Sequence, residues 1–304
     1  GIGNNGEREL SPPGLIIQDE LHLISGPLGS MCGLYEAVIE ELCTDRRGEP
    51  PACPKIVSST ATIRRYEDQI RGLFARDKVT LFPPPGIDAG DSFFASYAKD
   101  DDGELEKGRM YVGIHGGGLG SMETAQVRVF SSLFQAPFEL DSAERDPWWT
   151  MLIFFNSLWG IQKATSLFQS DVRDYLKLIK KRSGLDWDDL RKLRNVKELT
   201  SRISDDEVPV RLNELETPFE GDGSFPVDVC LASNIIEVGV DIDRLSLMSV
   251  VGQPKTTAQY IQVTGRVGRK PKTRPGLVAT IYSASASRDR SHYEKFRAYH
   301  GRLD

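Results

Sequence analysis

The most informative stretch of the chain is Gln262-Val263-Thr264-Gly265-Arg266-Val267-Gly268-Arg269. It places two arginines three residues apart, each directly after a glycine. If the segment from Thr257 onward is helical, positions 259, 262, 266 and 269 share one polar face. Guanidinium groups on a short, rigid frame suit the oxygens of a phosphoryl group in transfer. A solvated basic helix end explains the same residues, so the stretch must be weighed together with the rest of the chain.

A second informative stretch lies near the start of the chain. There the apolar run Leu15-Ile16-Ile17-Gln18 ends in Asp19-Glu20-Leu21-His22. In one known arrangement, a buried strand ends in two acids, the first of which holds Mg²⁺ while the second orients a water. Magnesium keeps most of its waters, so one or two carboxylates are enough. A strand followed by a helix with acids in its first turn fits the same residues.

Two further motifs lie between these stretches. Ser58-Ser59-Thr60-Ala61-Thr62 follows an apolar run, and Ala232-Ser233-Asn234 is followed shortly by Gly239-Val240-Asp241. The four motifs, in this order, resemble motifs II, III, V and VI of superfamily 2 helicases and translocases. The resemblance extends from about residue 14 to about residue 283. The amino-acid sequence of residues 17–29 further resembles that of the large helicase of bacterial DISARM anti-phage systems.

This resemblance implies a chemical role for the motif residues. Glu20, Arg266 and Arg269 would be catalytic, because hydrolysis of a nucleoside triphosphate depends on positioning and charge stabilisation. Asp19 and Glu20 would hold Mg²⁺ through water. Glycine at 239 permits a close backbone approach and Asp241 could accept from ribose hydroxyls, although a turn glycine and a capping aspartate explain that pair as well. The residues implied in ATP binding are Asp19, Glu20, Gly239, Asp241, Gln262, Arg266 and Arg269.

The resemblance also implies residues that couple ATP hydrolysis to nucleic acid. His22 would report the nucleotide state toward Thr60 and Thr62, although a hydrogen-bonded histidine at a helix start is the alternative. Ser233 and Asn234 follow an apolar run, at the position where the family contacts a phosphate of nucleic acid. Simple capping of a helix explains the same two residues.

The phosphate-binding loop of the family is missing from this sequence. No Gly-x-x-x-x-Gly-Lys-[Ser/Thr] occurs in the 304 residues. The glycine-rich stretch at 113–120 has no lysine and follows the acidic motif, so we interpret it as a turn between a strand and a helix. The family's phosphate loop precedes motif II. We therefore expect a fragment of a larger enzyme, cut within its first motor domain and inactive alone.

The order of apolar runs predicts an α/β fold with parallel sheets, organised as tandem RecA-like domains of which the first is incomplete. Residues 1–85 would be the last part of the first domain, 86–107 a linker and 108–304 the second domain, with a charged helical insertion near 171–195. A helix with apolar residues at 31, 34, 35, 38, 39 and 42 should cover a sheet face. Strands are expected at 15–18, 55–57, 79–82, 110–114, 150–155, 227–232, 245–251 and 276–282.

Composition limits the function classes. A net charge of −6 argues against a general nucleic-acid coat but leaves room for a basic stripe in a cleft. The four cysteines form no Cys-x-x-Cys pair, so zinc is not expected and free thiols in a reducing cytoplasm are. No apolar run has the length of a membrane span. The expected partners are nucleic acid, DNA before RNA, and other proteins of a defence complex, with no membrane.

Two function classes follow from these residues. The first is an ATP-dependent helicase or translocase that uses ATP and Mg²⁺ to move on DNA, with a role in anti-phage defence. The second is a helicase fold without ATPase activity that serves as a nucleic-acid-binding scaffold. Glu20, Arg266 and Arg269 are all present, which favours the enzyme.

Overall fold

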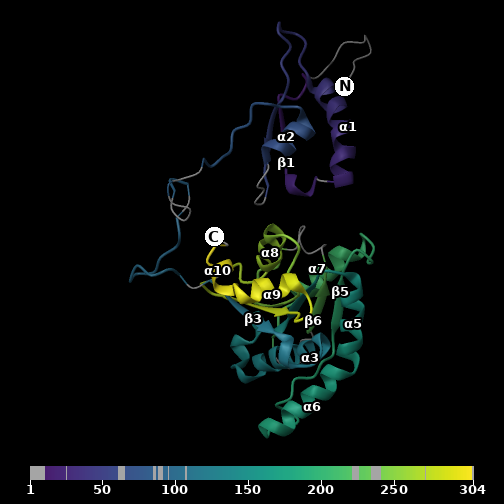
Figure 1. The fold of residues 1–304 in the computed structure, drawn as a ribbon, viewed down its shortest axis with the longest axis vertical. Coiled ribbons are helices and arrows are strands. Elements are labelled where there is room, and N and C mark those ends of the chain that lie inside the picture. Colours follow the sequence, from purple (N-terminus) through teal and green to yellow (C-terminus); the bar gives the residue numbers. More distant parts are fainter. Residues whose placement is uncertain are drawn as a thin grey trace. The chain divides into compact units, whose positions relative to one another are not determined.

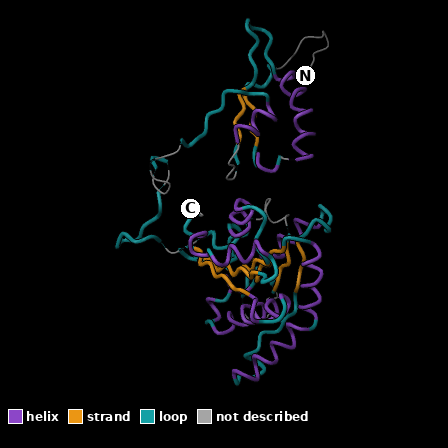
Figure 2. Tube along the Cα trace, viewed as in Figure 1, coloured by secondary structure: helices purple, strands orange, loops and turns teal. Residues whose placement is uncertain are grey.

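The computed structural model describes residues 11–24, 26–60, 66–84, 87, 92–94, 96–106, 108–220, 226–233, 241–270 and 272–302. The chain divides into two compact units, Gly1–Gly86 and Ile87–Asp304 (Figure 1). In both units strands lie beside helices (Figure 2). The fold class is therefore α/β, as the sequence predicts. Within the described ranges, no helix combines the length and apolar character that crossing a membrane requires.

The first unit contains a small parallel sheet. Strand β1 pairs with β2 in the register that sets Gln18 opposite Ser58. Leu21, Leu73 and Phe74 form a buried cluster beside this sheet, since the turn after β1 packs against the end of helix α2. The elements of this unit are β1 (Leu15–Gln18), the 3-10 turn η1 (Leu21–Leu23), α1 (Gly26–Cys43), β2 (Lys55–Ser58) and α2 (Tyr66–Phe74).

The apolar side of α1 is exposed, which differs from the sequence expectation. Its side chains range from 40% exposed at Ile39 to 77% at Leu34. The sheet beside it has two strands, and Ile17 of β1 is itself 73% exposed. A sheet two strands wide offers too little surface to bury an eighteen-residue helix face. The exposed apolar residues of α1 are Leu28, Met31, Leu34, Tyr35, Val38, Ile39 and Leu42.

The described residues of the second unit form six parallel strands in the order β3-β8-β7-β4-β6-β5. Parallel strands need crossover connections, and helices supply most of them here. The central strands are almost fully buried, because helices lie on both faces of the sheet. The strands are β3 (Arg109–His115), β4 (Met151–Phe155), β5 (Val196–Leu199), β6 (Val229–Ala232), β7 (Leu247–Val251) and β8 (Gly276–Tyr282).

Strand β4 shows how the sheet separates two cores. Met151, Ile153 and Phe155 pack into one apolar cluster, while Leu152 and Phe154 pack into the other. This alternation is the period-two pattern of a strand that is covered on both sides. Figure 1 shows α3 and α6 on one side of the sheet and α8, α9 and α10 on the other. The first cluster is covered by α3 (Met122–Gln135), α5 (Leu158–Gln169) and α6 (Asp171–Ser183), and the second side by α7 (Glu207–Glu216), α8 (Thr257–Thr264), α9 (Ser287–Glu294) and α10 (Phe296–His300).

Three segments differ from the sequence expectations, and one agrees with them. Residues 79–82 form no strand, because they lie in an extended stretch beside a proline-rich segment. The charged segment 171–195 is helical only over α6, and Gly184 in the left-handed conformation ends that helix. The glycine-rich stretch is a turn between β3 and α3, as expected. Strand β5 was not anticipated, since Lys197 and Glu198 give this edge strand a polar sequence.

A buried ion pair ties together the ends of the second unit's strands. The side chain of Arg191 is fully buried and its Nη2 lies 3.1 Å from Oδ1 of Asp228. The same guanidinium donates to the carbonyl oxygens of Phe134 and Trp149 at 3.0 and 2.6 Å and lies over both rings. Asp228 also accepts from the backbone N–H groups of residues 194 and 195. Burial lowers the pKa of Arg191 to about 10.

We predict that Asp228→Asn destabilises the chain by about 3–5 kcal/mol, because it leaves the Arg191 cation buried without its counter-charge. Urea unfolding followed by circular dichroism measures the effect. Lys177→Met is the matched control, because the Lys177–Asp174 pair is exposed and its loss should cost about 0.5 kcal/mol or less. Equal losses in the two variants would contradict a structural role for the buried pair.

Candidate functional site

The carboxylate of Asp19 lies at the carboxyl end of β1, directly after Gln18. It accepts hydrogen bonds from the Glu20 N–H at 2.8 Å and from the Ser59 hydroxyl. The hydrogen bond from Ser59, followed by that from the Glu20 backbone, holds the pKa of Asp19 below its usual value. An ionised, solvent-accessible carboxylate at a strand end is the kind of oxygen donor that a hard cation prefers.

Glu20 adopts the left-handed backbone conformation, with φ 52°. For a residue with a side chain this conformation costs roughly 1–2 kcal/mol. It turns the chain sharply, so that Leu21 enters the core while the Glu20 side chain stays 44% exposed. Glu20 Oε2 lies 3.4 Å from Nδ1 of His22. Backbone strain of this kind is concentrated at functional sites, and here it brings the second acid and the histidine together.

The pairing of β1 with β2 brings the start of the motif at residues 58–62 next to the acidic motif that begins at Asp19. The Ser59 N–H donates to the Gln18 carbonyl at 2.9 Å, and the Ser59 carbonyl accepts from the Leu21 N–H at 3.0 Å. Ser59 is therefore the residue of this motif that contacts Asp19. Thr60 follows it and is exposed. Thr62 lies outside the described residues, and the coupling of His22 to the two threonines stays a prediction.

Two residues of this site were not anticipated from the sequence. Ser59 follows β2 as Asp19 follows β1, so the parallel register carried a signal for their contact. Gln69 of α2 donates through Nε2 to the carbonyl oxygens of Leu21 and Ile24, at 2.8 and 2.7 Å. Its amide thus holds the turn that follows the acidic pair. No spacing in the sequence pointed to Gln69.

The arginine motif begins on a helix and ends in a turn. Helix α8 is capped by the Thr256 hydroxyl, which accepts from the Gln259 N–H, and it ends at Thr264. Gln259 and Gln262 are thus helical, but Arg266 and Arg269 lie beyond the helix end. The expectation of one helical face through all four positions is therefore wrong. The left-handed Gly268 is what turns the chain away from the helix axis.

Gly268 is required by a close backbone contact. Its φ is 63°, and a Cβ built on it would lie 2.6 Å from the Cα and N atoms of Gly276 at the start of β8. Its N–H donates to the Leu245 carbonyl at 2.8 Å. On the residue before it, the Val267 carbonyl accepts from Nε of Arg109 at 2.7 Å. The turn between the two arginines is therefore fixed by three neighbouring segments.

The arginine motif meets the Gly-Val-Asp motif through ion pairs. Arg269 Nη1 lies 2.8 Å from Asp241 Oδ1, with the two side chains 32% and 65% exposed. Lys270 Nζ lies 2.5 Å from Asp243 Oδ2, and this contact lowers the pKa of Asp243. An exposed pair contributes about 0–1 kcal/mol. Arg269 is therefore held weakly enough to exchange Asp241 for a more highly charged partner.

Two other predicted nucleotide residues, Gln262 and Arg266, are half-buried, and the Arg266 N–H donates to the Val263 carbonyl. An open cavity of about 760 Å³ is lined by Asp241, Asp243, Lys270 and Arg274 among others. Gly239 lies outside the described residues, and the ribose contact predicted for Asp241 stays a prediction.

The predicted nucleic-acid residues belong to the opposite end of the same sheet. Ser233 follows β6, is buried, and its N–H donates to the Leu199 carbonyl. Asn234 lies outside the described residues. Ser157 follows the adjacent strand β4 and caps α5, accepting from the Gly160 N–H at 3.2 Å. Because neighbouring parallel strands end at one edge, Ser157 joins Ser233 there. Asn156-Ser157 directly follows the apolar run 151–155, and this spacing is the sequence signal for Ser157.

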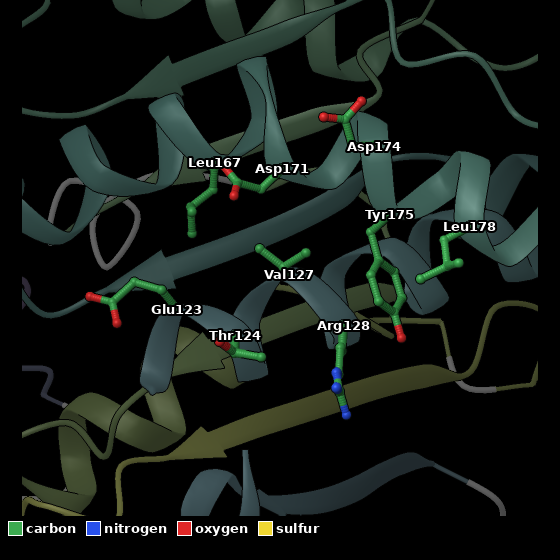
Figure 3. A pocket seen from close by; sticks show the side chains of 9 residues that line it. All are labelled: Glu123, Thr124, Val127, Arg128, Leu167, Asp171, Asp174, Tyr175 and Leu178. Carbon is green, nitrogen blue, oxygen red and sulfur yellow. The ribbon is translucent and has the colours of Figure 1, made fainter. Parts of the chain in front are cut away.

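A separate groove lies between α3, α5 and α6 (Figure 3). It has a volume of about 420 Å³ and an apolar floor that includes Val127 and Leu167. Glu123 and Asp174 stand near its opposite ends in this view. It contains none of the motif residues, so the groove is distinct from both ends of the sheet described above.

We predict that Gly268→Ala destabilises the second unit by at least about 2 kcal/mol, because a Cβ there adds a backbone clash to the cost of the left-handed conformation. Gly184→Ala is the matched control, since Gly184 has φ 66° with open space around its Cα. Gly184→Ala should lower the free energy of unfolding by only about 1 kcal/mol. Thermal unfolding ranks the two variants, and an equal loss would show that the contact with Gly276 is not tight.

Comparison with known proteins relates the chain to helicases. The family model described as helicase conserved C-terminal domain matches residues 174–271. The DISARM protein DrmA of Bacillus paralicheniformis is 41% identical over 297 residues, which are 96% of this chain and 26% of that protein. The chain thus spans about a quarter of the length of this relative.

Two solved structures share the fold at low sequence identity. The helicase Lhr of Mycobacterium smegmatis, bound to single-stranded DNA and AMP-PNP, has a TM-score of 0.57 at 16% identity, over 94% of this chain and 31% of that one. Dbp5 of S. cerevisiae, bound to RNA and ADP BeF3, has a TM-score of 0.53 at 16% identity, over 95% of this chain and 58% of that one. The matching family model and the 41% identity to DrmA show that the chain carries a helicase conserved C-terminal domain, and the solved helicases share its RecA-like fold.

Proposed function

We propose that this chain is part of an ATP-dependent helicase or translocase that couples ATP hydrolysis to movement on DNA, in the setting of anti-phage defence. The observation that carries the proposal is the acidic pair after β1. One carboxylate is hydrogen-bonded and kept ionised, and the other is turned outward by a strained backbone beside a histidine. Two acids in such different environments suit two different roles.

On this proposal, Asp19 holds Mg²⁺ through water while Glu20 orients or deprotonates the water that attacks the nucleotide. The exposed, ionised Asp19 carboxylate fits a hydrated magnesium ion, which needs few protein ligands. Bound magnesium neutralises charge on the phosphates. Ser59 keeps the Asp19 carboxylate oriented, and His22 lies close enough to Glu20 to sense its state.

The arginine motif supplies the positive charge that the transferring phosphoryl group requires. Arg269 would leave Asp241 for the nucleotide, since a phosphate carries more charge than the exposed carboxylate. Arg266 and Gln262 would assist on the same group. These roles, together with those of Gly239 and Asp241, rest on the motif resemblance.

Nucleic acid would bind along the edge that carries Ser157 and Ser233. A hydroxyl there can donate to a backbone phosphate, and the amino-terminal end of α5 adds N–H groups and a favourable dipole. DNA as the substrate is part of the proposal, and a defence complex as the setting rests on the similarity to the DISARM protein. Asn234 belongs to the same proposal.

We predict opposite binding effects for the two acids in the full-length enzyme. Glu20→Gln keeps the size and hydrogen bonding of the side chain but removes the proton acceptor, so it should abolish hydrolysis while Mg-ATP still binds. Asp19→Asn should weaken the part of nucleotide affinity that depends on magnesium. Nucleotide affinity measured with and without Mg²⁺ separates the two. Identical binding defects would remove the division of roles, and unchanged hydrolysis in both variants would support an inert scaffold.

We also predict that Arg269→Ala lowers ATP turnover in the full-length enzyme by a factor on the order of 10³, as loss of an arginine finger does. Nucleotide affinity should fall much less, because the charge that Arg269 meets develops in the transition state. Lys270→Ala is the matched control: it removes the adjacent exposed cation and its pair with Asp243, and turnover should stay close to normal. Near-normal turnover in Arg269→Ala would make this guanidinium a surface group.

A further inference from the structure

Trp159 is a large apolar side chain left in solvent at the nucleic-acid edge of the sheet. It lies in the first turn of α5, two residues after Ser157, and is 65% exposed. A single exposed apolar residue is common on protein surfaces. The position of this one is what makes it informative, because it lies in the first turn of the helix that begins at the carboxyl end of β4.

The indole is held in place by charges on one of its faces. Nζ of Lys163, one helical turn further along α5, lies 3.8 Å from the centre of the ring. Lys163 in turn lies 2.8 Å from Oε1 of Glu123 on α3. Figure 3 shows Glu123 standing at the end of α3, at the margin of the groove. The Lys163 ammonium group occupies one face of the ring, and Trp159 as a whole is still 65% exposed.

The surroundings of the ring carry phosphate-binding chemistry. Strands β4, β6 and β5 are neighbours, so the residues that follow them share one edge. Ser157 and Ser233 follow β4 and β6, and the exposed Arg202 follows β5. The Ser157 hydroxyl, the N–H groups at the start of α5 and the Arg202 cation therefore follow strands that end at the same edge as the one from which α5 begins. Nonspecific binding of single strands combines such a polar track with an aromatic platform for the bases.

We propose that the uncovered face of Trp159 stacks on a base of single-stranded nucleic acid whose backbone runs along the ends of β4, β6 and β5. The inference rests on the proposed function and adds a base-contacting residue to it. Every base has a π-face, so the contact tolerates any sequence. Lys163 fixes the ring before the strand arrives, which reduces the ordering that binding requires.

The test measures the affinity of the full chain for a fluorescent oligothymidine by anisotropy. Trp159→Ala should weaken binding by about 5- to 150-fold, the range that loss of one stacked base gives. Trp159→Phe should restore most of the affinity, because a smaller ring still stacks. Trp187→Ala is the matched control: Trp187 is 62% exposed with Lys180 4.6 Å from its ring centre, but it precedes β5 and so belongs to the other end of the sheet.

A second arm removes the base instead of the ring. An oligonucleotide with abasic positions should bind the wild-type chain more weakly than oligothymidine, while Trp159→Ala should bind the two alike. If wild type and Trp159→Ala bind oligothymidine equally, stacking is overturned and the indole becomes a protein-contact residue. If the wild-type chain binds no single strand at all, the nucleic-acid edge fails and the stacking proposal with it, whereas the proposed ATP hydrolysis is tested separately by the Glu20 and Arg269 variants of the full-length enzyme.

Discussion

The buried contact between Arg191 and Asp228 is the interaction on which the second unit depends. Asp228 stands immediately before β6, and its carboxylate also holds the segment that leads into β5. The guanidinium reaches the carbonyl groups of Phe134, at the end of α3, and of Trp149, just before β4. One charged pair thereby fixes the entry of three strands and the end of a helix. Burying an unpaired charge is costly, so these segments can pack together only in the arrangement that keeps Arg191 and Asp228 paired.

A second anion extends this frame toward the arginine motif. The carboxylate of Asp146 lies 3.1 Å from Arg244 Nε and 3.2 Å from Arg274 Nη1, and it accepts from the Phe219 N–H at 2.7 Å. Arg244 leads into β7 and Arg274 into β8. The segments that carry Asp241 and Arg269 are therefore tied to each other before any ligand binds. The ion pairs of Asp146 with Arg244 and Arg274 therefore help to position both the Asp241 motif and the arginine motif.

The sequence predicted the strands that are continuous apolar runs. The run that became β4 and the run that became β1 were identified because their apolar residues are continuous and end in polar motifs. Edge strand β5 escaped notice, since Lys197 pairs with Glu214 and Glu198 accepts from Thr165, so its polar residues are satisfied by neighbours distant in sequence. The extended residues 79–82 had strand-like composition but no partner strand among the described residues.

The candidate site was predictable in its residues but not in its geometry. The acidic pair follows from a motif, whereas the left-handed Glu20 follows from the packing of Leu21. The helical face drawn through Arg266 and Arg269 was wrong because periodicity carries no information about the contact between Gly268 and Gly276. Ser59 could have been found by counting the register of two parallel strands. Gln69 could not, because its role arises from the tertiary position of α2.

The charges of this chain divide by burial into a frame and a set of exchangeable contacts. Arg191 and Arg244 are buried, and each meets several fixed partners, so moving them would strand charge inside the protein. Arg269 and Lys270 are at least partly exposed, and each meets one carboxylate that solvent also reaches. Exposed pairs exchange at little energetic cost. On the proposed function, the rigid frame therefore presents cations that can exchange a carboxylate for a phosphate without being reorganised.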